Sequence, residues 1–118
     1  PAAICLGQAT SQRNLLRNAA RPIVAALSRE CRAHAHLGVF EDDMVTYLVK
    51  HAYGRTGIFS VEGTQLEAYC TALGKVLLAH QPATHVERYL SRGEFVALTP
   101  ATITDVEHLR AELEVVRD

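Results

Sequence analysis

The segment 69–75, with the sequence YCTALGK, holds the residues best suited to bind a ligand. Thr71 can cap a helix that begins at Ala72, because a threonine hydroxyl accepts a hydrogen bond from an amide two or three residues later. The first amides of a helix have no partner within it and carry about half a positive charge, and Gly74 allows close approach. Such a helix start suits a carboxylate, sulfate or phosphate. The same pattern is also typical of an ordinary capped helix whose Gly74 packs tightly on a sheet.

Histidine and cysteine offer weaker candidates for chemistry. His34 and His36 share one face of an expected strand. No spacing supplies the further ligands that a zinc site needs, so we expect no metal and a role within the sheet. Cys70 could have a lowered pKa beside a helix start, which leaves a small hydrolase as a third interpretation. The sequence has no GxSxG, HExxH, P-loop or GxGxxG pattern, so we expect no enzymatic activity and no cofactor.

A long amphipathic helix is expected near the start of the chain. Apolar residues recur at steps of three and four from 10 to 31, which is the helical period. Pro22 lies in the middle of this pattern. An interior proline removes one hydrogen bond and clashes with the preceding turn. We therefore expect either a kink near Arg21 or a break that places Pro22 at the start of a second helix.

Three strands are expected after this helix. Alternating apolar and polar residues predict strands over 34–40 and 44–53, and the polar turn at 41–43 predicts that the two form an antiparallel hairpin. Residues 58–61 predict a third strand. Three strands are few for a sheet that must cover several helices. We therefore expect that another chain completes the sheet or that part of the domain is missing.

Three helices are expected in the second half. The first follows the capped segment described above and ends before Pro82. Two capping boxes of the S/T-x-x-E type, Thr84 with Glu87 and Thr104 with Glu107, predict the other two helices. The order of helix, strands and helices lacks regular βαβ alternation. It predicts an α+β fold with an antiparallel sheet.

Composition places the chain among ordinary globular proteins of one domain. It has 118 residues, a net charge of −1, and is 48% hydrophobic and 21% charged. The balanced charge argues against a nucleic-acid surface on this chain, and no apolar run approaches the ~20 residues that cross a bilayer. Three scattered cysteines suggest reduced thiols in the cytoplasm. The chain begins without methionine, so we expect that it is cut from something longer.

Several motifs together resemble one known family. Residues 63–79, GTQLEAYCTALGKVLLA, resemble the glycine, "TALGK" and "LLA" segments of the effector-binding domain of IclR-type bacterial transcriptional regulators. Residues 98–104, LTPATIT, resemble that family's "LTPxTIT" segment. The stretches 16–27 and 36–48 add weaker similarity. "TALGK" and "LTPxTIT" at this separation form a specific combination, and the similarity covers residues 6–118.

The resemblance implies a fold and a function. The fold would be α+β and GAF-like, a curved antiparallel sheet flanked by helices, here incomplete at its C-terminal end. Residues 1–20 would be the linker helix from a winged helix-turn-helix domain absent from this chain, and residues 21–118 part of the effector-binding domain. The chain would sense a small, usually acidic metabolite, form a homodimer or homotetramer, and change operator DNA binding by the absent domain.

The resemblance also implies an effector site around the capped helix. Backbone contacts to the effector carboxylate would fall on Ala72 and Leu73, capped by Thr71. Apolar walls would fall near Ile58 and Leu66. The remaining polar ligand contacts of the family lie in strands after the final helix, which this chain does not contain. The expected effector-binding residues are Ile58, Leu66, Tyr69, Thr71, Ala72, Leu73 and Gly74.

Two positions depart from the family pattern. The family commonly has proline and histidine where this sequence has Glu67 and Tyr69. Glu67 would repel an acidic ligand if it points toward the site, so the effector's identity and charge stay open. An alternative function is an oligomerisation module without ligand binding. The incomplete sheet and the apolar stripe of Leu15, Leu16 and Ala19 support it.

Overall fold

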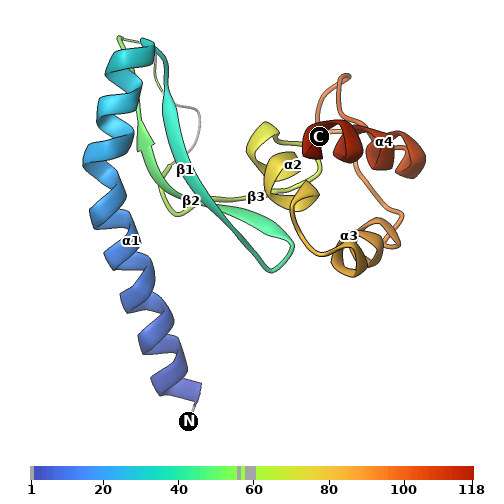
Figure 1. Cartoon of the computed structure of the whole chain (residues 1–118), viewed down its shortest axis with the longest axis horizontal. Helices are drawn as coiled ribbons and strands as arrows, with labels where there is room; N and C mark the ends of the chain where they lie inside the picture. The colour runs from blue at the N-terminus through green and yellow to red at the C-terminus, as the bar shows by residue number, and fades with distance from the viewer. Residues whose placement is uncertain (1, 56, 58–60) are drawn as a thin grey trace. The chain divides into compact units, whose positions relative to one another are not determined.

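The computed structural model describes residues 2–55, 57 and 61–118. It combines helices with one three-stranded sheet in the order β1-β2-β3 (Figure 1), which is the α+β class that the sequence predicts. In chain order the elements are α1 (Ala2–Cys31), β1 (Ala35–Glu41), β2 (Met44–His51), β3 (Gln65–Glu67), α2 (Ala72–Ala79), α3 (Ala83–Leu90) and α4 (Val106–Arg117).

The chain divides into two compact units. The first unit combines residues 1–38 with 47–64, and the second combines residues 39–46 with 65–118. The predicted boundary at residue 20 lies within the first unit, and the assignment of residues 1–20 to a linker helix stays a prediction. Within the described part of the chain, no helix is both long enough and apolar enough to cross a membrane.

Helix α1 is continuous through Pro22, so the predicted break there is wrong. A proline leaves the carbonyl four residues earlier, here that of Asn18, without its amide donor. Both residues are exposed, so water can hydrate that carbonyl, and the helix continues on either side. The helix begins at Ala2, earlier than the apolar pattern indicates. It ends before Arg32, whose φ of 53° is the left-handed conformation common after a helix C-terminus.

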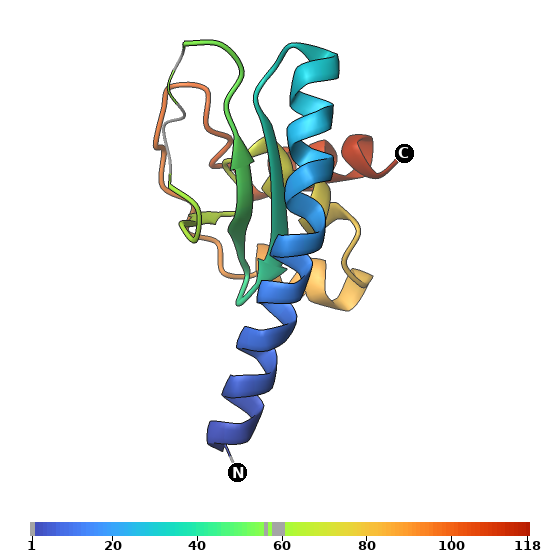
Figure 2. The same ribbon diagram turned by 90° about the vertical axis from the view of Figure 1, so that its left-hand side faces the viewer.

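Two arginines of α1 form hydrogen bonds within the first unit, where the helix lies alongside the parts of β1 and β2 that belong to this unit (Figure 2). The Arg17 Nε donates to the carbonyl of Leu48 at 3.2 Å. The Arg21 guanidinium donates two hydrogen bonds of 2.9 Å to the Glu62 carboxylate, which also accepts from the Lys50 amide at 3.0 Å. The hydrogen bonds from Arg21 hold the pKa of Glu62 below its usual value. Charged groups, in addition to apolar contact, therefore position this helix.

The predicted hairpin of β1 and β2 is confirmed. Asp42 and Asp43 have φ values of 51° and 63°. Two consecutive positive values are what a two-residue type I′ turn requires, and this turn matches the twist of paired strands. Aspartate enters this region more readily than most residues, which explains why no glycine is needed here.

The third strand lies later in the chain than predicted. Of the predicted strand, residues 58–60 lie outside the described residues and Val61 is not in a strand. Strand β3 instead pairs antiparallel with β2, with Val45 opposite Leu66. Three residues are too short for an alternating pattern to be recognised.

Helix α3 begins without the predicted capping box. Its N-cap is Pro82, with φ −52° and ψ 142° and no side-chain cap, so Thr84 lies inside the helix. The Pro82 carbonyl accepts from the amides of His85 at 2.8 Å and Val86 at 3.1 Å. Glu87 does not return to the helix start, because its carboxylate is paired with Arg110.

Helix α4 begins one residue later than predicted. The cap is Asp105, whose side chain accepts from the His108 amide at 2.8 Å. Thr104 therefore lies outside the helix, and the predicted capping box of Thr104 with Glu107 is wrong. Aspartate caps at least as well as threonine, and its negative charge is favoured at a helix N-terminus.

Helices α2 and α4 pack on each other inside the second unit, with Leu78 and Leu109 fully buried. The Lys75 ammonium forms an ion pair with the Glu112 carboxylate across this contact. The lysine of the "TALGK" segment therefore joins two helices. The hydrogen bond from Lys75 holds the pKa of Glu112 below its usual value.

We predict that this ion pair contributes stability only above mildly acidic pH. Because the pKa of Glu112 is lowered by folding, its contribution is present above the unfolded pKa of about 4.3 and is lost as pH falls through the lower folded value. Glu112→Gln should therefore be less stable than wild type near pH 7 and equally stable at the acid end. Urea unfolding across pH measures this. Glu94→Gln, which removes an exposed carboxylate, is the matched control. A stability difference for Glu112→Gln that does not change with pH would contradict the prediction.

Candidate functional site

The predicted site falls at the start of α2. Thr71 is the N-cap, with φ −118° and ψ 147°, and its hydroxyl oxygen accepts from the Gly74 amide at 3.0 Å. The Thr71 carbonyl accepts from the Lys75 amide at 2.9 Å. Within the described residues, the amides of Ala72 and Leu73 have no acceptor. Ala72 is exposed and Leu73 is half-buried. Two adjacent donors at the positive end of a helix are therefore available to a ligand.

Gly74 is required by the chain's own backbone. A Cβ atom at this position would lie 2.3 Å from the Ala68 carbonyl oxygen and 2.5 Å from the Ala68 Cα. Gly74 is also buried. Of the two interpretations of Gly74, close packing within the protein is therefore the one that the structure shows. The backbone of residue 68 already fills the space beside this glycine. Gly74 shapes the site without being available to touch a ligand.

An aromatic cluster holds the loop that precedes α2. The Tyr69 hydroxyl donates to the carbonyl of Val96 at 2.8 Å, and the Tyr69 amide donates to the Tyr89 hydroxyl oxygen at 3.2 Å. The Phe95 ring lies 4.9 Å from the ring of Tyr69 and 5.8 Å from that of Tyr89, measured between centroids. Tyr69 is buried, and its polar atoms are used within the protein. It therefore positions the helix start rather than facing a ligand.

We predict that Tyr89→Phe loosens this support. The Tyr89 hydroxyl oxygen accepts from the Tyr69 amide, and burial raises the pKa of Tyr89 to about 12, so this group stays neutral at any ordinary pH. Its removal leaves a buried amide unpaired, which costs about 1–2 kcal/mol of unfolding free energy. Urea denaturation measures the loss. Tyr53→Phe, at an exposed tyrosine, is the control and should change stability by much less. Equal stability of Tyr89→Phe and wild type would show that the bond is dispensable.

Cys70 is not an activated thiol. Its sulfur donates to the carbonyl of Glu67 at 3.5 Å. Burial raises the pKa of the Cys70 thiol, and the negative charge of Glu67 adds to the rise. The expectation of a lowered pKa at this position is wrong, because desolvation outweighs the helix start. The interpretation as a thiol hydrolase loses its physical support.

The two remaining predicted positions are Leu66 and Ile58. Leu66 is half-buried in β3, and Ile58 lies outside the described residues. The histidines serve the first unit: the His34 Nδ1 accepts from the Tyr53 amide at 3.0 Å, and the His36 ring packs edge-on against Tyr47. Among the described residues, no three His, Cys, Asp or Glu side chains gather in a way that could hold a metal ion.

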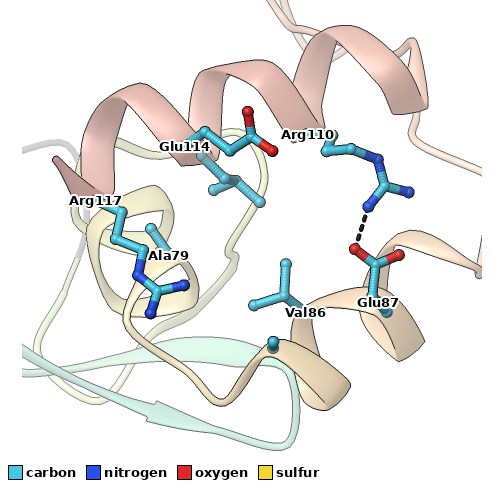
Figure 3. A pocket seen from close by; sticks show the side chains of 8 residues that line it. Ala79, Val86, Glu87, Arg110, Glu114 and Arg117 are labelled. Atoms are coloured by element: carbon cyan, nitrogen blue, oxygen red, sulfur yellow. Dashed lines mark hydrogen bonds and ion pairs between the residues drawn. The ribbon is translucent and has the colours of Figure 1, made fainter.

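A concave pocket lies at the other end of α2, and no sequence motif predicted it. It is formed by α2, α3 and α4 within the second unit and has a volume of about 180 Å³. Figure 3 shows its lining side chains, with the Arg110–Glu87 ion pair at one side. The lining residues are Ala79, Ala83, Val86, Glu87, Arg110, Leu113, Glu114 and Arg117. These residues come from two separate stretches of sequence, 79–87 and 110–117, which the packing of the three helices brings together.

Comparison with known proteins identifies the class. The family model described as "Bacterial transcriptional regulator IclR C-terminal" matches residues 8–118. The chain therefore belongs to the C-terminal domain family of bacterial IclR transcriptional regulators, as the sequence motifs indicate.

Named relatives are bacterial regulators. The Pca regulon regulatory protein of Pseudomonas putida is 32% identical over 120 residues, covering 99% of this chain and 41% of the relative. The transcriptional regulator KdgR of Dickeya chrysanthemi is 35% identical over 95 residues, covering 80% of this chain and 30% of the relative. The chain thus spans less than half the length of these curated relatives.

Solved structures share the fold. A transcriptional regulator from Rhodococcus sp. RHA1 matches with a TM-score of 0.83 and 28% identity, covering 99% of this chain and 48% of that one. An IclR homologue from Microbacterium hydrocarbonoxydans, solved in complex with 4-hydroxybenzoate, matches with a TM-score of 0.79 and 26% identity. It covers 89% of this chain and 44% of that one.

Proposed function

We propose that this chain is the effector-sensing and oligomerisation part of an IclR-family regulator. The effector would control DNA binding by a winged helix-turn-helix domain that lies outside the sequence described here. The single observation that carries the proposal is the pair of amides at Ala72 and Leu73, both without an acceptor in the described residues, at the start of a capped helix. That helix is the segment with which the family motif agrees best.

The ligand class follows from the chemistry of this helix start. A carboxylate can accept from both amides while the helix dipole stabilises its charge. The negative charge of Glu67 would repel a second negative charge on the ligand. Burial is the main cause of the raised pKa values of Cys70 and Tyr69, and the charge of Glu67 adds to both. We therefore expect a monocarboxylate to bind better than a dicarboxylate. A relative's structure with 4-hydroxybenzoate supports this class of ligand.

The coupling to DNA is thermodynamic. An effector shifts the equilibrium between two arrangements only by the difference between its affinities for them. Such coupling between sites is typically about 1–3 kcal/mol. A regulator of this kind works in the cytoplasm, where operator DNA is found.

A thermal-shift experiment tests sensing. 4-Hydroxybenzoate is the probe, and neutral 4-hydroxybenzamide is its matched control. A ligand that binds only the folded chain raises the melting temperature as its concentration rises. We expect a rise with the acid and little or none with the amide. Equal effects of the two compounds would show that the carboxylate is not recognised, and no effect of a panel of monocarboxylates would favour the assembly module without ligand.

Helix α1 supports the oligomerisation part of the proposal. Its exposed apolar side chains include Leu15, 68% exposed, and Ile23, 69% exposed. Contiguous exposed apolar surface of this kind marks interaction sites, and a second copy would cover it in a homodimer or a homotetramer. Sedimentation measures the mass of the assembly. Leu15→Glu with Ile23→Glu should shift it toward the monomer, whereas Arg29→Gln on the same helix should not.

A further inference from the structure

The pocket between α2, α3 and α4 is distinct from the start of α2. Ala79, which lines the floor of the pocket, is the last residue of that helix. The floor is apolar: Ala79 and Leu113 are each 3% exposed, and Val86 is half-buried. Its volume of about 180 Å³ is close to the roughly 150 Å³ of an apolar protein cavity that holds one benzene molecule. The hollow therefore fits an apolar body of about the size of one six-membered ring.

The two arginines that line this pocket differ in whether they have an ion-pair partner. Arg110 is neutralised by its ion pair with Glu87 and by a second contact with Glu107 at 3.5 Å. Arg117 has no ion-pair or hydrogen-bond partner for its guanidinium within the described residues. In Figure 3 the guanidinium of Arg117 extends from α4 to the level of Val86, while the carboxylate of Glu114 lies across α4. The pocket thus combines an apolar floor with an exposed cation, Arg117, and an exposed carboxylate, Glu114, and neither has a partner within the described part of the chain.

We propose that this pocket is a second ligand site, which takes a monocarboxylate with a compact apolar body. The apolar body would lie on Ala79, Val86 and Leu113. The carboxylate would accept two hydrogen bonds from the planar guanidinium of Arg117, which matches carboxylate geometry better than any other side chain. A dianion is disfavoured because Glu87 and Glu114 also line the pocket.

The site has a consequence for the fold around it. Its lining comes from α2, α3 and α4, so an occupant would hold these three helices at fixed separations. A ligand that binds only this arrangement of the helices stabilises it, relative to any other arrangement, by the free energy of binding. Occupancy of this pocket is independent of the amides of Ala72 and Leu73, and the proposal does not depend on an effector at the start of α2.

Benzoate is the probe that tests the site, with neutral benzamide as the matched ligand. Titration followed by amide NMR of the 118-residue chain should show saturating shifts at Val86, Leu113 and Arg117. Arg117→Gln should weaken benzoate binding by about tenfold or more, the effect of removing a hydrogen bond to a charged group. Arg29→Gln, at an exposed arginine of α1, should leave the affinity unchanged, and benzamide should bind more weakly than benzoate.

Several outcomes would overturn the proposal. One is equal benzoate affinity in Arg117→Gln and wild type. Another is a set of shifts confined to Ala72 and Leu73, which would assign benzoate to the start of α2 alone. A third is benzoate binding that weakens as protein concentration rises, with a matching increase in sedimenting mass, because a second copy would then occupy the pocket. Ala83→Phe, which places a ring at the mouth, should abolish the shifts at Leu113, and retention of those shifts would also count against the site.

Discussion

Gly74→Ala is expected to destabilise the chain by about 3 kcal/mol, the upper end of the range for overpacking a buried site. Alanine favours a helix over glycine by about 1 kcal/mol, so the clash must exceed that gain. It does so because the added Cβ would lie 2.3 Å from the Ala68 carbonyl oxygen. That atom belongs to the backbone and cannot rotate away. To relieve this clash, α2 would have to move away from the preceding loop, which holds its N-cap residue Thr71.

Gly7→Ala is the matched control for this substitution. Gly7 also lies in a helix, α1, and a Cβ there would meet nothing within 4 Å. The same change should therefore be neutral or stabilise by up to about 1 kcal/mol. Urea denaturation of both variants measures the contrast. Similar unfolding free energies for the two would show that Gly74 is not confined by the Ala68 backbone.

Ala72→Pro is expected to weaken carboxylate binding by tenfold to a hundredfold, roughly the value of a hydrogen bond to a charged group. Proline deletes the amide at the first position of a helix, where it is otherwise well accepted. The preceding residue, Thr71, already has the extended conformation that proline requires of its neighbour. The helix should therefore persist while one of its two donors is lost. Calorimetric titration with 4-hydroxybenzoate measures the affinity.

Ala72→Ser is the control for the loss of the amide. It changes the side chain at the same exposed position and keeps the N–H group. Its affinity for 4-hydroxybenzoate should stay within a few-fold of wild type, and the melting temperatures of both variants should remain close to that of wild type. An Ala72→Pro variant that binds as tightly as Ala72→Ser would remove this amide from the site.

The sequence predicted those parts of the fold that local chemistry determines. The β1–β2 hairpin and the Thr71 cap were predicted because each is set by neighbouring residues. Pro22 was misjudged because its effect depends on whether water reaches the carbonyl of Asn18. The caps at Pro82 and Asp105 were missed because several residues near each helix start could serve, and tertiary contacts such as Glu87 with Arg110 decide between them.

The local structure at the candidate site was predicted in part for the same reason. Thr71, Ala72 and Leu73 form a local motif, and the structure gives the first of them the capping role that the motif indicates. The roles of Gly74 and Tyr69 could not be predicted, since each depends on a partner elsewhere in the fold: the backbone of residue 68 for the glycine, and Val96 for the tyrosine.

The proposed function depends on one claim: the start of α2 binds a ligand with a single negative charge. Amide NMR during titration with 4-hydroxybenzoate tests it most directly. We expect that the amide signals of Ala72 and Leu73 move furthest downfield and saturate together, and that they do not move with 4-hydroxybenzamide. Saturable binding of the acid that leaves these two amides unmoved would contradict it.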